Sequence, residues 1–451
     1  MNPAFCLSSV FMVGVLLATP VQAEVSAAEA AKLGSSLTPL GAEKSGNSVG
    51  TIPAWDGGLT KPVAGFKPGG HYPDPYAADK VLFSIASTNV DQYRERLTPG
   101  QVALLKKYPN WKMNVYPAHR SATYPRKTLD QSVANAPRAQ LVGDGVTGAL
   151  GGIPFPIPKD GLEAIWNTLL RYRGDAYATN WSQVAVTRDG DYTPVRFEYE
   201  YDFHYGNLTK PDKEREPNKL LNFLQTVTAP ARLAGQVLLV HETVDQVKQP
   251  RTAWVYSPGQ RRVRLAPNVA YDNPGTAADG LRTNDDFGMY NGATDRYDWK
   301  LLGKREMYVP YNSYKLSGNT LSYADVLQAG HLNPAATRYE LHRVWVVEAN
   351  LKPGTSHIYK KRVFYIDEDS WAVLVTDQYD ARNELWRVAE QHSINFYDVP
   401  MFFGTVEVHH DLQSGRYIAM GLRNQESRVF EPIASRASDF TPQGLRGIGT
   451  R

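Results

Sequence analysis

Cysteine, long apolar runs and a surplus of one sign of charge are nearly absent from this sequence. Cys6 is the only cysteine among 451 residues, and it lies in a segment expected to be removed. A disulfide, a thiol nucleophile and a cysteine-bound metal are therefore not expected in the mature chain. Beyond that segment no stretch approaches the roughly 18 apolar residues of a membrane-spanning helix. With 49 basic and 46 acidic residues and no long run of either sign, nucleic acid is not an expected partner.

The first 23 residues differ from the rest of the chain. An apolar core from Phe11 to Ala18 is followed by Val21-Gln22-Ala23, the small-residue pattern of a cleavage site. No Lys or Arg precedes the core, so only the terminal amine supplies the positive charge that is usual there. The segment (1–23) predicts a signal peptide cleaved after Ala23 and a periplasmic protein, attached to the outer membrane at most peripherally.

The most informative stretch is Val195 to Tyr205, which reads V-R-F-E-Y-E-Y-D-F-H-Y. Apolar side chains, most of them aromatic, alternate there with charged ones. Since successive side chains of a strand point to opposite faces, this pattern predicts a strand with one aromatic and one wet face. At about 3.3 Å per residue it runs roughly 35 Å, which is long for a strand. Such a stripe needs an apolar partner: a packed core, a lipid bilayer or a cavity that holds an apolar ligand.

Gly and Pro are concentrated before this strand, where they disfavour regular structure. Residues 24–160 are expected to form an N-terminal helical and extended wrap, with helical segments at Ala27–Leu33 and within Asp91–Tyr108. Residues 161–430 are expected to form a curved antiparallel β-sheet with lid helices, followed by a C-terminal tail at 431–451.

The part of the chain after Trp181 consists mostly of short β patterns joined by polar turns, without intervening helices, which indicates an antiparallel sheet. The last strands are apolar on both faces, so both faces need a covering layer. The predicted fold class is mainly β with peripheral helices: a curved antiparallel half-open barrel with a helical lid and the Gly/Pro-rich wrap. The predicted strands around the long one are Gln183–Thr187, Val237–Thr243, Arg251–Tyr256, Val263–Leu265, Arg343–Ala349, Lys361–Ile366, Trp371–Thr376 and Leu385–Glu390.

Aromatic residues supply the candidate binding site. For any single one of them core packing is the simpler interpretation, but as a set they suit the wall of a pocket for a large apolar ligand. The candidate cavity-lining residues are Phe197, Tyr199, Tyr201, Phe203, Trp254, Tyr256, Trp345, Phe364, Trp371 and Trp386.

Catalytic and metal patterns are weak. Gly46-Asn47-Ser48-Val49-Gly50 matches the serine-hydrolase pattern, but no buried strand precedes it and Thr51-Ile52-Pro53 cannot begin the required helix, so a loop is favoured. His241-Glu242 and His409-His410-Asp411 lack metal-site spacing, and ordinary hydrogen-bonded histidines are favoured. No catalytic residue, metal or cofactor is predicted.

Two pairs of carboxylates are the remaining candidates for a chemical role. Asp285 and Asp286 could bind Ca²⁺ or share a proton, although a loop that caps its own backbone is favoured. Glu198 and Glu200 lie on the wet face of the long strand, where a solvated surface is favoured.

Four motifs carry a resemblance to a known family. They are T-P-L-G-A-E-K at 38–44, G-T-I-P-A-W at 50–55, G-G-I-P-F-P at 151–156 and L-A-P-N-V-A-Y-D at 265–272. In them the chain resembles the proteobacterial domain of unknown function 1329, over nearly the whole mature sequence. The meander at 363–386 is also similar, more weakly, to periplasmic lipoprotein carriers of the LolA/LolB type.

The resemblance implies a half-open antiparallel barrel in which helices cover a hydrophobic cavity. It also implies a lipid-handling role in the envelope, with a transporter of the resistance-nodulation-division (RND) class or an outer-membrane protein as partner. It implies no established activity and no catalytic residues.

The hypothesis favoured by these observations is a periplasmic carrier or receptor for a large hydrophobic molecule, such as a lipid or a lipoprotein acyl chain. One alternative is a secreted hydrolase acting on lipid, polyester or glycan, for which Asp285 and Asp286 or Glu198 and Glu200 could serve. The other is an outer-membrane β-barrel, which needs at least eight strands of the long one-sided kind, whereas only one is found. The carrier or receptor is favoured over both, and a non-enzymatic role is therefore favoured over an enzymatic one.

Overall fold

The computed structural model describes residues 25–210, 216, 218–266, 269 and 271–448, so the predicted signal peptide lies outside the described residues. Among these residues no helix combines the length and hydropathy needed to cross a lipid bilayer. The helices are α1 Ala27–Ala30, α2 Pro99–Lys107, α3 Arg126–Asn135, α4 Gly161–Leu170, α5 Tyr314–Ser317, α6 Tyr323–Val326 and α7 Pro442–Ile448.

One large sheet dominates the structure. Its main path runs β11-β12-β13-β14-β15-β16-β17-β5-β6-β7-β8-β9-β10 and is antiparallel at every step. β1 and β2 join it through one parallel pair with β12, β18 pairs with β5, and β3 and β4 form a separate hairpin. The strands are β1 Phe83–Ala86, β2 Lys112–Val115, β3 Gln140–Val142, β4 Gly145–Thr147, β5 Ala176–Val186, β6 Val195–Phe203, β7 Lys219–Ala229, β8 Val237–Thr243, β9 Thr252–Ser257, β10 Arg262–Ala266, β11 Tyr297–Pro310, β12 Tyr339–Leu351, β13 Lys361–Asp367, β14 Val373–Tyr379, β15 Leu385–Phe396, β16 Met401–Asp411, β17 Tyr417–Leu422 and β18 Glu431–Pro432.

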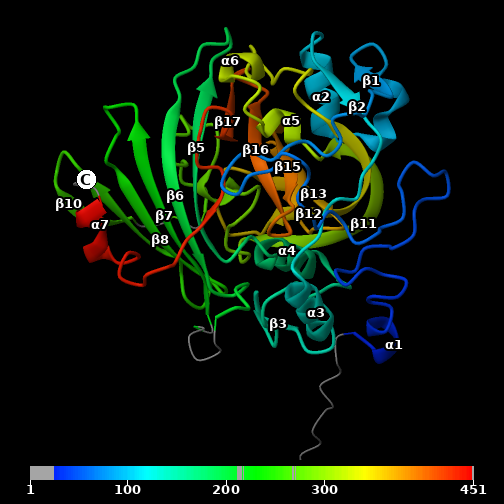
Figure 1. Cartoon of the computed structure of the whole chain (residues 1–451), viewed down its shortest axis with the longest axis horizontal. Coiled ribbons are helices and arrows are strands. Elements are labelled where there is room, and N and C mark those ends of the chain that lie inside the picture. The colour runs from blue at the N-terminus through cyan, green and yellow to red at the C-terminus, as the bar shows by residue number, and fades with distance from the viewer. Residues whose placement is uncertain (1–24, 211–215, 217, 267–268, 270, 449–451) are drawn as a thin grey trace, which may run out of the picture.

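The sheet is curved and is not closed into a barrel, as the fold prediction required. Among the described residues no pairing joins its two end strands, β10 and β11. Figure 1 shows β5 to β10 as a splayed half, while β11 to β16 curl tightly, with α2 and α5 in the upper part of the view and α4 in the lower part. We call these the splayed half and the curled half.

β6 confirms the period-two prediction over its first half. The strand ends at Phe203 and not at Tyr205, and Asp202 and His204, which were expected on the wet face, are buried. Phe197, Tyr199 and Tyr201 are buried on the face that we call the inner face, whereas Arg196 and Glu198 are exposed on the outer face. The aromatic face continues sideways because β5 and β7 pair with β6 along its length. Cross-strand aromatic neighbours of this kind stabilise a sheet.

The outer face is covered by helices on both sides of β6. Under α7, Leu224, Leu239 and Tyr256 pack against Phe440 and Leu445. Further along the sheet, side chains from β5, β16 and β17 pack against residues of α5 and α6. In the curled half, β14 is apolar on both faces and is buried from Val373 to Gln378, as predicted.

The N-terminal segment lies along the curled half and is held by polar anchors. Arg120 binds both carboxylate oxygens of Asp369, at 2.8 and 2.7 Å, and the Trp371 indole donates to the Leu40 carbonyl at 2.8 Å. At Gly41, with a φ of 88°, an added Cβ would lie 1.7 Å from the Pro156 carbonyl oxygen. Two parts of the wrap therefore approach each other closely enough to require glycine there.

Two predicted features need correction. Trp371, expected at the start of a strand, lies in the turn before β14 with a φ of 60°, so the strand begins at Val373. The helical segment expected within Asp91–Tyr108 is α helix only over Pro99–Lys107, where Thr98 caps the first turn and Pro99 opens it. The residues before it form short 3₁₀ turns.

α2 is fixed to the curled half by buried polar side chains. The Gln101 amide donates to Glu390 at 3.0 Å and to the Tyr308 carbonyl at 3.1 Å. Asp377 accepts hydrogen bonds from the Gly100 N–H and the Thr98 hydroxyl, both at 3.2 Å. Burial raises the pKa of Asp377 to about 7, since these donors only partly offset the loss of water.

We expect Asp377→Asn to stabilise the protein above neutral pH. Between about pH 4 and 7 the unfolded chain gives up this proton while the folded chain retains it, so the aspartate makes wild-type stability fall as the pH rises. Asparagine keeps an oxygen for the same donors and removes this dependence. The free energy of unfolding of Asp377→Asn relative to that of the wild type should increase by roughly 2–4 kcal/mol from pH 4 to 8. Urea denaturation measures both. A gain that is constant with pH would contradict the assignment.

Candidate functional site

A long loop between β10 and β11 lies over the inner face of the splayed half. We call its described residues 271–296 the roof loop. It contains one 3₁₀ turn, at Asn284–Asp286, and positive φ angles at Ala277, Asp279 and Met289, which are not glycines. Long connections and unusual backbone of this kind cluster at binding sites and lids.

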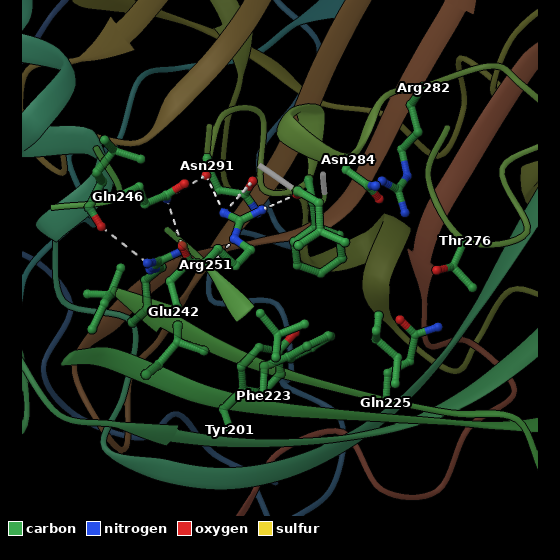
Figure 2. Close-up of a pocket in the computed structure, with 18 residues that line it drawn as sticks. Tyr201, Phe223, Gln225, Glu242, Gln246, Arg251, Thr276, Arg282, Asn284 and Asn291 are labelled. Carbon is green, nitrogen blue, oxygen red and sulfur yellow. Dashed lines mark hydrogen bonds and ion pairs between the residues drawn. The ribbon is translucent and has the colours of Figure 1, made fainter. Parts of the chain in front are cut away.

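Between the roof loop and the sheet lies a cavity of about 100 Å³, which we call the roofed cavity. Figure 2 shows Tyr201, Phe223 and Gln225 rising from the sheet, with Asn284 and Asn291 across from them on the roof side. Apolar side chains of β7 and β8 complete the floor, because alternate residues of each strand face inward. These floor residues are Leu220, Leu221, Leu238 and Val240, and Leu169 of α4 closes one end. The pairing of β7 is irregular between Lys219 and Leu221, and Leu220 also lines the cavity there.

One end of the roofed cavity is closed by a buried ion pair. Arg251 lies 2.7 Å from the Glu242 carboxylate and donates to the carbonyls of Asn291 and Val269. Gln246 donates to the other Glu242 oxygen at 2.7 Å. Although Arg251 counteracts it, burial raises the pKa of Glu242. The pair ties the roof loop to the residue just before β9.

A second buried network anchors the roof loop to the curled half. Asp285 lies 2.6 Å from the Arg362 guanidinium and 3.0 Å from His357. Asp286 accepts hydrogen bonds from Gln378 at 2.7 Å and from the Tyr359 hydroxyl at 3.0 Å. Burial alone raises the pKa of Asp285, but the cation Arg362 and the His357 hydrogen bond hold that pKa well below its usual value.

The two aspartates also cap their own loop, as the sequence favoured. The Thr283 N–H donates to Asp286 at 3.0 Å and the Thr283 hydroxyl donates to Asp285 at 2.5 Å. What the sequence did not indicate is the partner on the sheet, Arg362, which is completely buried.

A wider groove of about 510 Å³ lies beside the roofed cavity. Both are lined by Thr276, so this part of the roof loop separates them. The carbonyls of Thr276 and Ala277 accept hydrogen bonds from the Gln183 amide, at 3.0 and 2.7 Å. The groove is partly apolar, with Val195, Val227 and Leu233 among its walls.

Four of the ten candidate residues gather on the inner face beside this site. Tyr201 lines the roofed cavity, and Phe203 lines a smaller adjoining one of about 40 Å³. Tyr199 is 2% exposed and stacks on Trp181 with centroids 4.3 Å apart, and Phe197 is 1% exposed. Neither Phe197 nor Tyr199 lines the roofed cavity, because protein atoms already cover them. That these residues bind a ligand stays a prediction.

Two other candidates lie on the outer face. Trp254 and Tyr256 belong to the cluster under α7, with Phe440 and Leu445. The sheet therefore separates them from the roofed cavity.

The last four candidates lie in the curled half. Trp345 and Trp371 stack with centroids 6.0 Å apart, and Phe364 contacts Tyr290 at 5.4 Å. The Trp386 indole donates to a carboxylate, that of Asp411. None of the four is among the lining residues of the roofed cavity.

Other candidate chemistry has structural explanations. Ser48 is exposed in a turn with no strand before it, which supports the loop interpretation of that motif. His342, Asp367 and Asp369 are close enough for their ligand atoms to lie within 4.8 Å of one another. However, Arg120 already occupies both oxygens of Asp369, so that carboxylate has its countercharge. A metal cation at these residues would therefore be poorly stabilised, because Arg120 already neutralises Asp369.

Fold and site together define a half-open antiparallel sheet protein with a roofed, mostly apolar cavity on its inner face. The chain belongs to the family described as "Protein of unknown function (DUF1329)", which matches residues 84–446.

Among its relatives is the uncharacterized protein PA3922 of Pseudomonas aeruginosa, 53% identical over 440 residues, covering 97% of this chain and 96% of the relative. Two solved structures are more distant. A DUF1329 family protein from Desulfovibrio piger is 15% identical, with a TM-score of 0.41 over 60% of this chain and 91% of that one. A putative outer membrane lipoprotein-sorting protein domain from Vibrio parahaemolyticus is 13% identical, with a TM-score of 0.44 over 63% of this chain and 98% of that one.

Proposed function

We propose that this protein is a periplasmic carrier or receptor for a large hydrophobic molecule, which binds between the roof loop and the inner face of the splayed half. The observation that carries the proposal is the roofed cavity, where an apolar floor meets a few polar groups on a long loop. Concave, mostly apolar sites with a small number of placed polar groups are typical of ligand pockets.

The size of the cavity adds a requirement. About 100 Å³ is less than the roughly 300–1,000 Å³ of typical ligand sites, so a lipid-sized molecule needs the roof loop to move. The neighbouring groove of about 510 Å³ is separated from the cavity by Thr276 and Ala277. Displacement of these two residues from Gln183 would join the two spaces into one of sufficient volume.

We expect Val240→Phe to abolish binding of an apolar fluorescent probe while leaving the protein folded. The added ring would fill much of the roofed cavity, since Val240 lines its floor. Overpacking of this kind typically costs about 1–3 kcal/mol of stability. Probe titration beside thermal denaturation gives both quantities.

Val263→Phe is the matched control, because it adds the same ring to the outer-face cluster under α7. It should bind the probe as the wild type does. If the wild type binds no long-chain or polycyclic probe, the carrier function is rejected.

Export is part of this proposal and rests on the pattern at residues 1–23. The mature protein should begin at Glu24 and appear in the osmotic-shock fraction, as N-terminal sequencing can establish. Mass spectrometry of molecules co-purifying from the periplasm would identify the cargo. The partner we propose, from the family resemblance, is an RND-class transporter or an outer-membrane protein.

A further inference from the structure

Three arginines on the inner side of the sheet lack a carboxylate partner. Arg173, Arg282 and Arg423 make no ion pair with any residue in the described part of the chain. Arg282 and Arg423 are 5% and 4% exposed, and Arg173 is partly buried. Each donates instead to a main-chain carbonyl: Arg173 to Leu169 at 3.1 Å, Arg282 to Thr283 at 3.0 Å and Arg423 to Thr405 at 2.9 Å.

Their remaining hydrogen-bonding capacity is only partly used. The buried Nε atoms of Arg173 and Arg282 have no acceptor. Burial lowers the pKa of all three guanidinium groups, because nearby negative charge is too sparse to offset the loss of water. One carboxylate, Glu407, lies near Arg282 and Arg423 without forming an ion pair with either, and it accepts a hydrogen bond from the Gly288 N–H.

The three arginines line two adjoining cavities. Arg173 and Arg282 line the roofed cavity, and Arg173 and Arg423 line the smaller cavity beside it. Both cavities share Tyr201 and Phe287 as walls. Figure 2 shows Arg282 reaching down from the roof toward the side occupied by Thr276.

Two other buried arginines of this protein show the contrast. Arg362 and Arg251 lie 2.6 and 2.7 Å from carboxylates that hold them. Arg171 is also buried and donates to the Thr168 carbonyl without an ion pair to a described residue, but it lines neither cavity. A buried cation without a countercharge is costly, so natural proteins rarely retain one without a use for it. Guanidinium groups match carboxylate and phosphate oxygens in geometry and charge.

We infer that the hydrophobic molecule carries an anionic head group, a carboxylate or a phosphate, which Arg173, Arg282 and Arg423 bind. The apolar chain lies over Tyr201 and the floor of the roofed cavity. This inference rests on the proposed carrier function and narrows the cargo to anionic amphiphiles.

The first test compares two probes on the wild-type protein. cis-Parinaric acid and its methyl ester share one fluorescent chain and differ in the charge of the head. The acid should bind at least about tenfold more tightly, which corresponds to about 1.4 kcal/mol. Equal affinities would overturn the inference and leave the carrier function standing, whereas binding of neither probe would reject both.

A second arm adds inorganic phosphate to the complex with the acid. Phosphate lacks a chain, so it should displace the acid only at concentrations far above that of the acid. Displacement of the acid by phosphate at comparable concentrations would mean that the site binds the free anion alone. It would overturn the inference that the ligand is an amphiphile.

Variants then assign the residues. Arg282→Gln and Arg423→Gln should each weaken binding of the acid about tenfold and leave the ester unchanged. Arg196→Gln removes the same charge from the outer face of β6 and should change neither. Circular dichroism checks folding, and a preference for the acid that persists undiminished in both variants would overturn the assignment.

Discussion

Arg362→Met is expected to lower the free energy of unfolding by about 3–5 kcal/mol, the usual cost of leaving a buried countercharge unpaired. The substitution leaves Asp285 and Asp286 in the interior without the guanidinium that lies 2.6 Å from one and 3.5 Å from the other. The roof loop would lose its anchor on β13 as well. Urea denaturation monitored by tryptophan fluorescence measures the loss.

Arg282→Gln is the matched control for this experiment, since it also removes a buried arginine. Because Arg282 has no carboxylate partner among the described residues, its removal should leave stability unchanged or raise it. Equal losses in the two variants would contradict the distinction between paired and unpaired arginines.

The destabilisation caused by Arg362→Met should also become smaller at low pH. Because the pKa of Asp285 is depressed in the folded state, its contribution is present above the unfolded pKa of about 4 and is lost as the pH falls below it. The difference between wild type and Arg362→Met should therefore shrink in acid.

Tyr199→Ala is expected to cost about 3–5 kcal/mol, as is typical for truncation of a well-packed aromatic residue. Tyr199 lies between aromatic neighbours on both sides, with Trp181 stacked at 4.3 Å and Phe223 at 5.4 Å. The hole left by the ring has no atoms to fill it. Thermal or chemical denaturation measures the cost.

Tyr199→Phe keeps the ring and should change stability by less than about 1 kcal/mol. Should Tyr199→Ala prove as well tolerated as Tyr199→Phe, the aromatic face would be open to a ligand along its whole length, in contrast to the packed arrangement described above.

The period-two pattern predicted β6 well because one of its faces is wet. Arg196 and Glu198 mark the exposed side, so alternation is visible in the sequence. Short polar turns located the strands of the curled half in the same way. These are local signals, which a single sequence retains.

β7 was missed because both of its faces are buried. Its sequence K-L-L-N-F-L-Q-T-V-T-A shows no alternation, since Leu220, Leu221, Phe223 and Leu224 supply both sides. β11, β16 and β17 and the helix α3 were also not predicted. A strand without a wet face leaves only an apolar run, which does not distinguish sheet from helix.

The lining of the cavities could be predicted from the sequence only in part, for a similar reason. Aromatic composition selected Tyr201 and Phe203, which line the cavities, together with Trp254 and Trp345, which do not. Which face and which half a residue joins depends on pairing far along the chain. In the sequence the roof loop was marked only by the paired carboxylates Asp285 and Asp286. Its partner Arg362 is 77 positions from Asp285, beyond the reach of local patterns.

The two anchors of the roof loop have a mechanical consequence. Asp285 is held on the curled half and Asn291 on the residue before β9 in the splayed half, and the Asn291 N–H donates to the Asp285 carbonyl at 3.0 Å. Residues 285–291 thus link the curled half to the splayed half across the inner face of the curved sheet. The length of this segment limits how far the two halves can move apart. If the proposed cargo spreads the two halves, this segment is strained, and hydrogen exchange at the Asn291 amide should become faster when cargo binds.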